Sequence, residues 1–156
     1  MQQPALAIGD RAPDFTLPST SGESVHLFKQ LQHSAVVLFF YVAAFTPVCT
    51  AEVCSFRDNS ERFTDVNAAI YGIGFGPETV TRSFANYHRL PYPLLLDRGN
   101  RVRKLYGVPK SFGLLPGRST FVVGQDQKIL HVTQAGFDSH PHVLESLDIL
   151  RRGSPA

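Results

Sequence analysis

The fold is decided by residues 35–54, which read AVVLFFYVAAFTPVCTAEVC. Residues 35–41 are apolar, β-branched or aromatic without interruption, which is the pattern of a central strand covered on both faces. Pro47 suits the first turn of a helix, where its missing N–H is not needed, and Thr46 suits the N-cap position. The stretch therefore predicts a buried strand that leads directly into a helix.

The predicted helix holds the two cysteines of the chain, Cys49 and Cys54. Cys49 falls in the first helical turn, where unpaired N–H groups and the helix dipole stabilise an anion, and thiolate is the reactive form of cysteine. A fall in thiol pKa from about 8.5 to about 6 raises the ionised fraction at pH 7 from roughly 3% to about 90%. Because this gain is only about 30-fold, a fast reaction also needs donors that stabilise the transition state.

The spacing of the two cysteines carries a second inference. In an intact α-helix, residues five apart have Cα atoms about 8.6 Å apart, whereas a disulfide needs about 7 Å or less. A bridge between Cys49 and Cys54 therefore requires the first turns of the helix to unwind. On spacing alone a plainer interpretation stays open, in which Cys54 is a buried helix residue and Cys49 an incidental thiol.

Other segments of the chain match a known family. They are Gly9–Leu17, Phe56–Asp58, Tyr106–Val108 and Arg118–Val123. Together with residues 39–54, they closely resemble the peroxiredoxins, specifically the branch called bacterioferritin comigratory protein or peroxiredoxin Q. The resemblance extends over roughly residues 8–150. It implies an α/β protein with a thioredoxin-like fold, in which helices flank a mixed central β-sheet.

The resemblance also implies an activity and a role for individual residues. Cys49 matches the peroxidatic cysteine, which attacks a peroxide oxygen and becomes a sulfenic acid. Thr46 matches the threonine that hydrogen-bonds the peroxide, and Arg118 matches the arginine that holds the thiolate and the reacting oxygens. Cys54 stands where this branch often keeps a resolving cysteine, and Glu52 matches an acidic position that orients the arginine. The implied protein is a thiol-dependent peroxidase for hydrogen peroxide and alkyl hydroperoxides.

Partners and cofactors follow from the same resemblance. Sulfur carries the chemistry, so no metal, haem or flavin is expected. A thioredoxin-like or glutaredoxin-like dithiol is expected to reduce the disulfide by thiol–disulfide exchange. Because this branch is often monomeric, we expect a monomer or a weak dimer. His140 and His142 resemble surface residues more than a metal pair, because no further ligand set lies near them in the sequence.

The sequence departs from the family motif at one position. The motif is Pro-x-x-x-Thr-x-x-Cys, and Val42 stands in the place of the proline. Valine can still shield the thiolate from water, but it does not fix φ and it restores an N–H that needs a partner. This departure keeps a second hypothesis open, a thioredoxin-fold thiol sensor or binding module with weak or no peroxidase turnover.

Composition bounds the remaining possibilities. A chain of 156 residues that is 43% hydrophobic suits one domain over residues 1–156 with a sizeable core. The net charge is +2 and the basic residues are scattered, so no nucleic-acid partner is expected, and the basic cluster at 98–104 is predicted to be a solvated helix face. The chain shows no leader pattern and no run of 18 apolar residues, which predicts a soluble cytoplasmic protein without a membrane partner.

The hydrophobic pattern predicts alternating strands and helices. Strands are predicted at 14–17, 24–27, 35–41, 68–74, 94–96, 119–123 and 128–133, and helices at 47–63, 77–88, 101–106 and 141–151. This alternation is typical of an α/β fold with a mixed sheet. Residues 119–133, divided by Gly124–Gln127, predict a hairpin. The glycine-rich segment 72–76 predicts a strand-to-helix turn, because it lacks the spacing and the lysine of a phosphate-binding loop.

Overall fold

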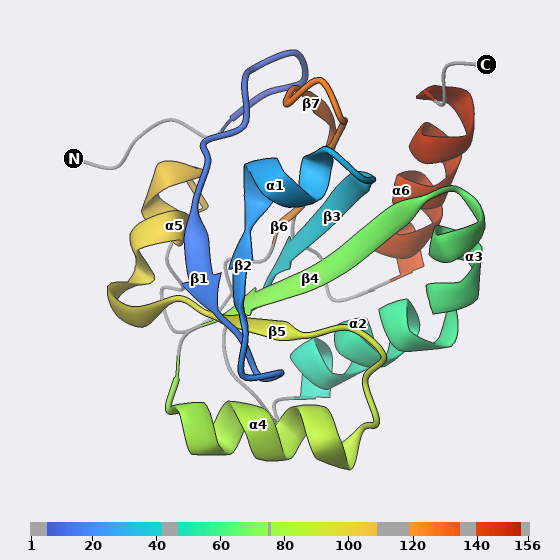
Figure 1. Cartoon of the computed structure of the whole chain (residues 1–156). Helices are drawn as coiled ribbons and strands as arrows, with labels where there is room; N and C mark the ends of the chain where they lie inside the picture. The colour runs from blue at the N-terminus through green and yellow to red at the C-terminus, as the bar shows by residue number, and fades with distance from the viewer. Residues whose placement is uncertain (1–5, 42–46, 75, 109–118, 135–139, 154–156) are drawn as a thin grey trace.

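A five-stranded mixed sheet lies at the centre of the structure, which is a computed structural model (Figure 1). The structure describes residues 6–41, 47–74, 76–108, 119–134 and 140–153, and of residues 47–49, 52, 134, 140–142 and 153 it describes the backbone alone. The sheet strands are β3 (Ala35–Phe40), β4 (Ala68–Gly74), β5 (Leu94–Leu96), β6 (Ser119–Val123) and β7 (Ile129–Gln134). Their order is β5-β4-β3-β6-β7, and β3 runs parallel to β4 and antiparallel to β6. The predicted mixed sheet is therefore confirmed.

Helices and a small hairpin cover the two faces of this sheet (Figure 1). The helices are α1 (Leu27–Leu31), α2 (Pro47–Asp58), α3 (Ser60–Asp65), α4 (Glu78–Tyr87), the 3-10 turn η1 (Arg98–Asn100), α5 (Arg101–Leu105) and α6 (His140–Gly153), and the hairpin pairs β1 (Thr16–Pro18) with β2 (Ser24–His26). One core cluster joins the sheet to α1, α5 and β1, and the other joins it to α2, α3, α4 and α6. Within the described ranges, no helix is long and apolar enough to cross a membrane.

Consecutive side chains of β3 alternate between these two clusters. Val36, Leu38 and Phe40 belong to the cluster with α1 and α5. Val37 and Phe39 belong to the cluster with α2 and α4, and all five side chains are 0% exposed. Because a strand points successive side chains to opposite faces, a strand covered on both faces needs an uninterrupted apolar run. The predicted buried strand is confirmed, and it is the strand that precedes the cysteine-bearing helix.

Several predicted elements have the predicted bounds, among them β4, β5 and β6. The predicted hairpin of β6 and β7 is also confirmed. Its turn is closed by two backbone hydrogen bonds of 2.9 Å, from the Gly124 N–H to the Lys128 carbonyl and from the Gln127 N–H to the Gly124 carbonyl. These segments were predictable because their signals are local, either a run of apolar residues or a cluster of turn formers.

The short helix α1 was not predicted, since the sequence pattern extended a strand as far as Leu27. The Asp14 carboxylate accepts the Phe28 N–H at 3.0 Å and lies 2.7 Å from Nε2 of His26. An oxygen of the Asp14 side chain thus accepts the N–H of a residue in the first turn of α1, which has no hydrogen-bond partner within the helix. Because that oxygen belongs to a residue 14 positions earlier in the chain, no local pattern indicates the helix.

The single helix predicted over 47–63 is in fact two helices, α2 and α3, that meet at Asn59. The backbone of Asn59 has φ −108° and ψ 11°, and its side-chain amide donates to the Ser55 carbonyl at 2.8 Å. Asparagine breaks helices in this way because its side chain offers the backbone a competing hydrogen bond. The break limits α2 to the segment that carries both cysteines.

The basic cluster at 98–104 is not wholly a solvated face. Arg98, Arg101 and Lys104 are exposed, as predicted, but Arg103 is only 7% exposed. The Asp97 carboxylate accepts both the Val102 N–H at 3.1 Å and the Arg103 N–H at 2.9 Å. The buried carboxylate thus fixes the first turn of α5, in which Arg103 is buried, so the prediction was wrong for Arg103.

Candidate active site

The helix α2 carries both cysteines. It begins at Pro47, as the pattern predicted, so the backbone of Cys49 lies in its first turn. Unpaired N–H groups and the helix dipole favour an anion at this place. The predicted position of Cys49 at the start of the helix is confirmed. The side chains of Cys49 and Glu52 lie outside the described part of the chain.

Cys54 lies on the same helix and is a half-buried free thiol. The backbone of α2 is helical without interruption from Pro47 to Asp58, so it separates the two cysteines by the helical distance that the sequence predicted. This Cα separation of about 8.6 Å exceeds the limit of about 7 Å for a disulfide. The helix of this structure therefore has the geometry of a reduced form.

Three predicted site residues, Val42, Thr46 and Arg118, lie outside the described residues. The described strands nevertheless show how the end of β3, which precedes Val42 in the chain, lies relative to the start of β6, which follows Arg118. β6 begins at Ser119, and Ser119 pairs with Phe40, the last residue of β3. The start of β6 and the end of β3 therefore lie side by side, at the carboxyl end of β3 from which the chain continues towards α2.

The thiol of Cys54 contacts a histidine that the sequence did not point to. The Cys54 sulfur lies 3.5 Å from Nδ1 of His88. Arg57, one turn further along α2, donates from Nη1 to the His88 carbonyl at 2.9 Å. The Asp58 carboxylate accepts a hydrogen bond from Nε of Arg57 at 3.0 Å, and this bond raises the pKa of Arg57. A fixed cation thus lies close to the Cys54 sulfur.

His88 was missed because its contact is not local. It ends the predicted helix 77–88, and nothing in that pattern separates it from the five other histidines of the chain. The contact joins residues 34 positions apart, and only the tertiary structure brings the end of α4 to Cys54. The spacing of residues along the sequence does not indicate a contact between a cysteine on one helix and a histidine at the end of another.

The second half of α2 is held firmly against the sheet. The hydroxyl of Tyr92 donates to the Val53 carbonyl at 2.7 Å. Phe56 stacks on Phe39 of β3 with ring centroids 4.7 Å apart and an interplanar angle of 7°. Val53 and Phe56 are both 0% exposed. The helix is therefore anchored from Val53 onwards, and Cys54 lies at the beginning of the anchored part.

Two glycines of β4, Gly72 and Gly74, allow close packing against aromatic side chains at the end of β3 and directly after it. A Cβ placed on Gly72 would lie 2.6 Å from the Phe39 ring and 2.7 Å from Leu94, which is too close for any side chain. Gly74 is pressed in the same way against Tyr41. Both glycines belong to β4 and not to a turn, so packing explains them without a phosphate. The predicted strand-to-helix turn includes residue 75, which lies outside the described residues.

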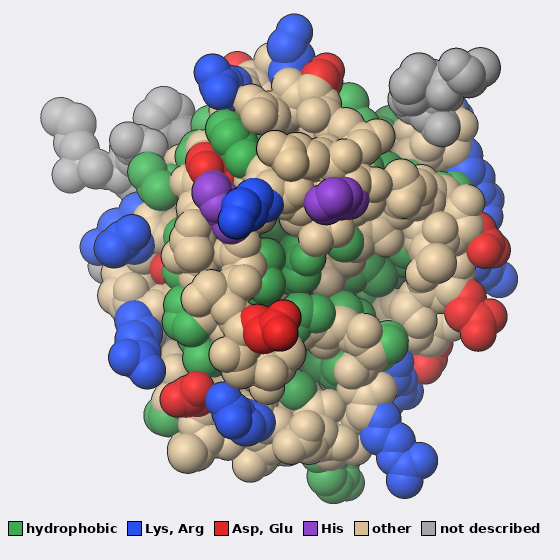
Figure 2. Space-filling model, viewed as in Figure 1, with side chains coloured by type: hydrophobic (Ala, Val, Ile, Leu, Met, Phe, Trp, Pro, Cys, Tyr) green, Lys and Arg blue, Asp and Glu red, His purple; other side chains and the backbone are tan. Residues whose placement is uncertain are grey.

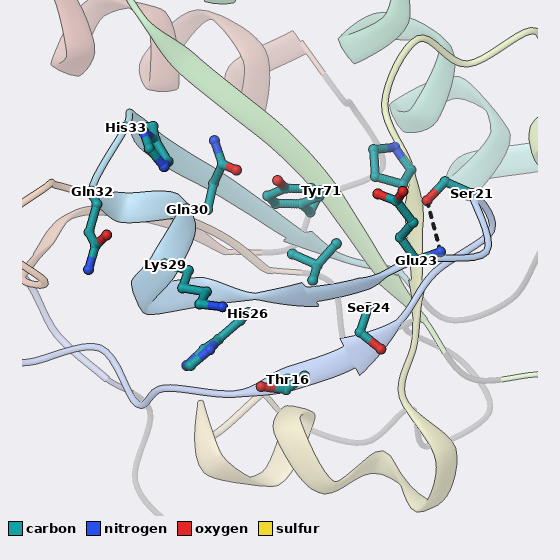
Figure 3. Close-up of a pocket in the computed structure, with 12 residues that line it drawn as sticks. Thr16, Ser21, Glu23, Ser24, His26, Lys29, Gln30, Gln32, His33 and Tyr71 are labelled. Atoms are coloured by element: carbon teal, nitrogen blue, oxygen red, sulfur yellow. Dashed lines mark hydrogen bonds between the residues drawn. The ribbon is translucent and has the colours of Figure 1, made fainter.

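A polar pocket of about 740 Å³ lies on the other side of the sheet from α2 (Figures 2 and 3). Figure 2 shows a hollow with apolar side chains in its floor. In Figure 3, His26, Lys29 and His33 lie along one part of its rim and Glu23 along the opposite part. Cys54, the predicted catalytic residue whose side chain the structure describes, is not among the residues that line this pocket. Among the described residues no group of three or more potential ligands is placed to hold a metal ion.

Comparison with known proteins gives consistent matches. The model of the AhpC/TSA family matches residues 8–132. The chloroplastic peroxiredoxin Q of Triticum aestivum is 39% identical over 92% of this chain and 66% of that protein, and the one of Sedum lineare is 39% identical over 92% of this chain and 77% of that protein. The crystal structure of peroxidoxin BcpB from Mycobacterium tuberculosis has a TM-score of 0.86 at 39% identity, covering 94% of this chain and 97% of that one. The predicted thioredoxin-like peroxiredoxin fold is confirmed, and the chain spans about two thirds of the length of the Triticum aestivum protein.

Proposed function

Because this chain belongs to the AhpC/TSA family, in the peroxiredoxin Q branch of the peroxiredoxins, we propose that it is a thiol-dependent peroxidase. The observation that carries the proposal is the position of Cys49, whose backbone lies in the first turn of α2, close after a buried central strand. The helix start favours the thiolate, which is the nucleophile of this reaction.

In the proposed first step, the Cys49 thiolate attacks the terminal oxygen of a peroxide. A sulfur–oxygen bond forms as the oxygen–oxygen bond breaks, and the leaving alkoxide or hydroxide takes up a proton. The products are a sulfenic acid on Cys49 and an alcohol or water. Thr46 and Arg118 supply the hydrogen-bond donors to the reacting oxygens, and Glu52 orients the arginine. Donors of this kind supply the part of the acceleration that ionisation alone cannot.

In the proposed second step, Cys54 resolves the sulfenic acid. The Cys54 thiolate attacks the sulfur of Cys49, a disulfide forms, and hydroxide leaves and becomes water. Because the intact helix keeps the two cysteines too far apart, the first turns of α2 unwind to allow this step. The anchoring contacts of Val53 and Phe56 support a movement of Cys49 towards Cys54 rather than the reverse.

The proposed substrates are hydrogen peroxide and alkyl hydroperoxides, and the proposed reductant is a thioredoxin-like or glutaredoxin-like dithiol. The described half-buried position of Cys54 suits exchange with such a partner at its sulfur. No cofactor is needed for these steps. A monomeric state and a cytoplasmic location stay predictions, and the names of the curated relatives describe those proteins as chloroplastic.

The test is intact mass spectrometry of the reduced protein. One equivalent of hydrogen peroxide is added for a few seconds, and free thiols are then alkylated. We expect loss of two hydrogens with no alkylation, while the Cys54→Ser variant stops at an oxidised Cys49 and the Cys49→Ser variant does not react. Two alkylated thiols in the wild-type protein would overturn the proposal. They would favour instead the thiol sensor or binding module that the Val42 departure suggests.

A further inference from the structure

The side chain of His88 contacts the sulfur of Cys54, and the fold holds that side chain in place. His88 follows the last residue of α4, and its N–H donates to the Phe84 carbonyl at 3.1 Å. Its carbonyl accepts a hydrogen bond from Arg57 at 2.9 Å. Its ring packs edge-on against Phe84 with centroids 4.8 Å apart and against Tyr87 with centroids 5.0 Å apart. These contacts hold both the backbone and the ring of His88 in place, with Nδ1 at 3.5 Å from the Cys54 sulfur.

A cation lies beside the pair, where it can stabilise a thiolate on Cys54. Among the described residues, the charged or titratable side chains with contacts in this region are Arg57 and Asp58 on α2, Tyr87 on α4 and Tyr92 before β5, and Arg89 follows His88 in the chain and is exposed. Arg57 is the cation of this group, and its Nη1 donates to the His88 carbonyl at 2.9 Å. When the thiol loses its proton, the thiolate lies close to a guanidinium that is already fixed to the His88 backbone.

We propose that His88 is the base that accepts the Cys54 proton in the resolving step, an inference that rests on the proposed function. Nδ1 takes the proton as the Cys54 sulfur attacks the sulfur of the Cys49 sulfenic acid. The sulfur–sulfur bond forms, the sulfur–oxygen bond breaks, and the departing hydroxide takes a proton to become water. The net change is one sulfenic acid and one thiol converted to one disulfide and one water. This role requires the His88 tautomer with its hydrogen on Nε2.

The anchoring of α2 explains why the contact can persist during the reaction. The Tyr92 hydroxyl holds the Val53 carbonyl at 2.7 Å, and the Phe56 ring stacks on Phe39. Unwinding on the N-terminal side of Val53 brings Cys49 towards Cys54 while these contacts stay formed. The Cys54 sulfur therefore remains beside His88 at the moment when it must become a nucleophile.

The expected size of the effect follows from thiol ionisation. A thiol of ordinary pKa, about 8.5, is roughly 3% ionised at pH 7, so a base that ionises it fully gains at most about 30-fold. Without the base, the thiolate fraction rises with pH and reaches about 90% at pH 9.5. A base at this position therefore matters most at neutral pH and loses its advantage in alkaline solution.

The test compares the wild-type protein with the His88→Asn variant, whose amide occupies the place of Nδ1 but is not basic. Rapid quenching with a thiol alkylator and mass spectrometry follows the sulfenic acid and the disulfide separately, from pH 6.5 to pH 9.5. At pH 7 we expect sulfenic acid formation within about twofold of wild type and disulfide formation slowed by about tenfold. The deficit is expected to close at pH 9.5. The exposed His33, far from α2, gives the matched control His33→Asn, with wild-type rates throughout.

Two results would overturn the role of His88. One is disulfide formation in His88→Asn at the wild-type rate at pH 7. The other is a deficit of the same size at every pH, since that would mean that the side chain only supports the structure. If His88→Asn does not fold, the His88→Gln variant is measured in the same way, and the pH dependence of disulfide formation in the wild-type protein provides a second test. Without a base, the wild-type rate of disulfide formation would rise tenfold per pH unit up to the thiol pKa, and such a rise would overturn the role of His88. Failure of the wild-type protein to form any sulfenic acid would instead reject the proposed peroxidase function.

Discussion

Replacement of Tyr92 by phenylalanine tests the anchor that holds the second half of α2. The change removes the hydroxyl that donates to the Val53 carbonyl at 2.7 Å and keeps the ring, which packs edge-on against Phe39 at 5.8 Å and 85°. Tyr92 is 7% exposed, so water does not replace the lost donor freely. The Val53 carbonyl lies inside α2 and keeps its helical partner, so no buried acceptor is left without a hydrogen bond.

The magnitude follows from these contacts. A neutral hydrogen bond contributes about 0.5–1.5 kcal/mol net, and the acceptor remains satisfied, so we expect Tyr92→Phe to lower the free energy of unfolding by about 1 kcal/mol. For a chain of this length that corresponds to a fall in Tm of about 2–4 °C. Amide exchange is expected to increase on both sides of Val53, because the helix loses its fixed point there.

Urea unfolding followed by circular dichroism measures the change in stability, and hydrogen exchange with mass spectrometry measures the local effect. The control is Tyr87→Phe, because Tyr87 is 76% exposed and loss of its hydroxyl should change stability by less than about 0.5 kcal/mol. An unchanged unfolding midpoint together with unchanged exchange in α2 would refute the reasoning that Tyr92 anchors this helix. A loss above about 3 kcal/mol would show that the hydroxyl does more than bond to Val53.

Three further predictions concern redox state, catalysis and pH. Residues 49–54 are expected to exchange faster in the disulfide form than in the reduced form, while residues after 54 keep their protection; equal protection in both forms would contradict unwinding. Arg118→Ala is expected to slow peroxide attack at least tenfold without loss of fold, since a charged hydrogen bond contributes about 1.5–3 kcal/mol; an unchanged second-order rate would remove this residue from the mechanism. Burial, with a smaller contribution from Asp14, raises the pKa of Tyr106 well above its ordinary 10.0. The folded state therefore resists ionisation of a group that the unfolded chain ionises, so stability is lost as pH rises above 10, by up to about 1.4 kcal/mol per pH unit. Urea titrations between pH 9 and 11 should show a shallower loss in Tyr106→Phe, and identical slopes would contradict the assignment.

Local signals explain which elements could be predicted. The apolar run at 35–40 had to be covered on both faces, and the structure divides its side chains between two core clusters. The helix start at Pro47 and the turn at Gly124–Gln127 depend on residues adjacent in the chain. The break at Asn59 shows the limit of this reasoning, because an apolar helical pattern continues past a side chain that ends the helix.

Contacts between distant residues explain what was missed. The oxygen that meets the first turn of α1 comes from Asp14, and the partner of the Cys54 sulfur comes from His88, 34 positions away. The buried Arg103 lies in a turn that the Asp97 carboxylate, six positions earlier in the chain, fixes by accepting the Arg103 N–H. Neither spacing nor composition carries information of this kind.

The sequence by itself indicated the class of this protein, because residues 39–54 and segments along most of the chain resemble the peroxiredoxins. It also determined that the two cysteines cannot bridge without unwinding, because helical spacing depends on residue number alone. Only the tertiary structure decided which half of α2 stays anchored and which side chain meets the second thiol. The physical reason is that anchoring and proton transfer depend on atoms that packing brings together from separate elements, at distances that no local pattern records.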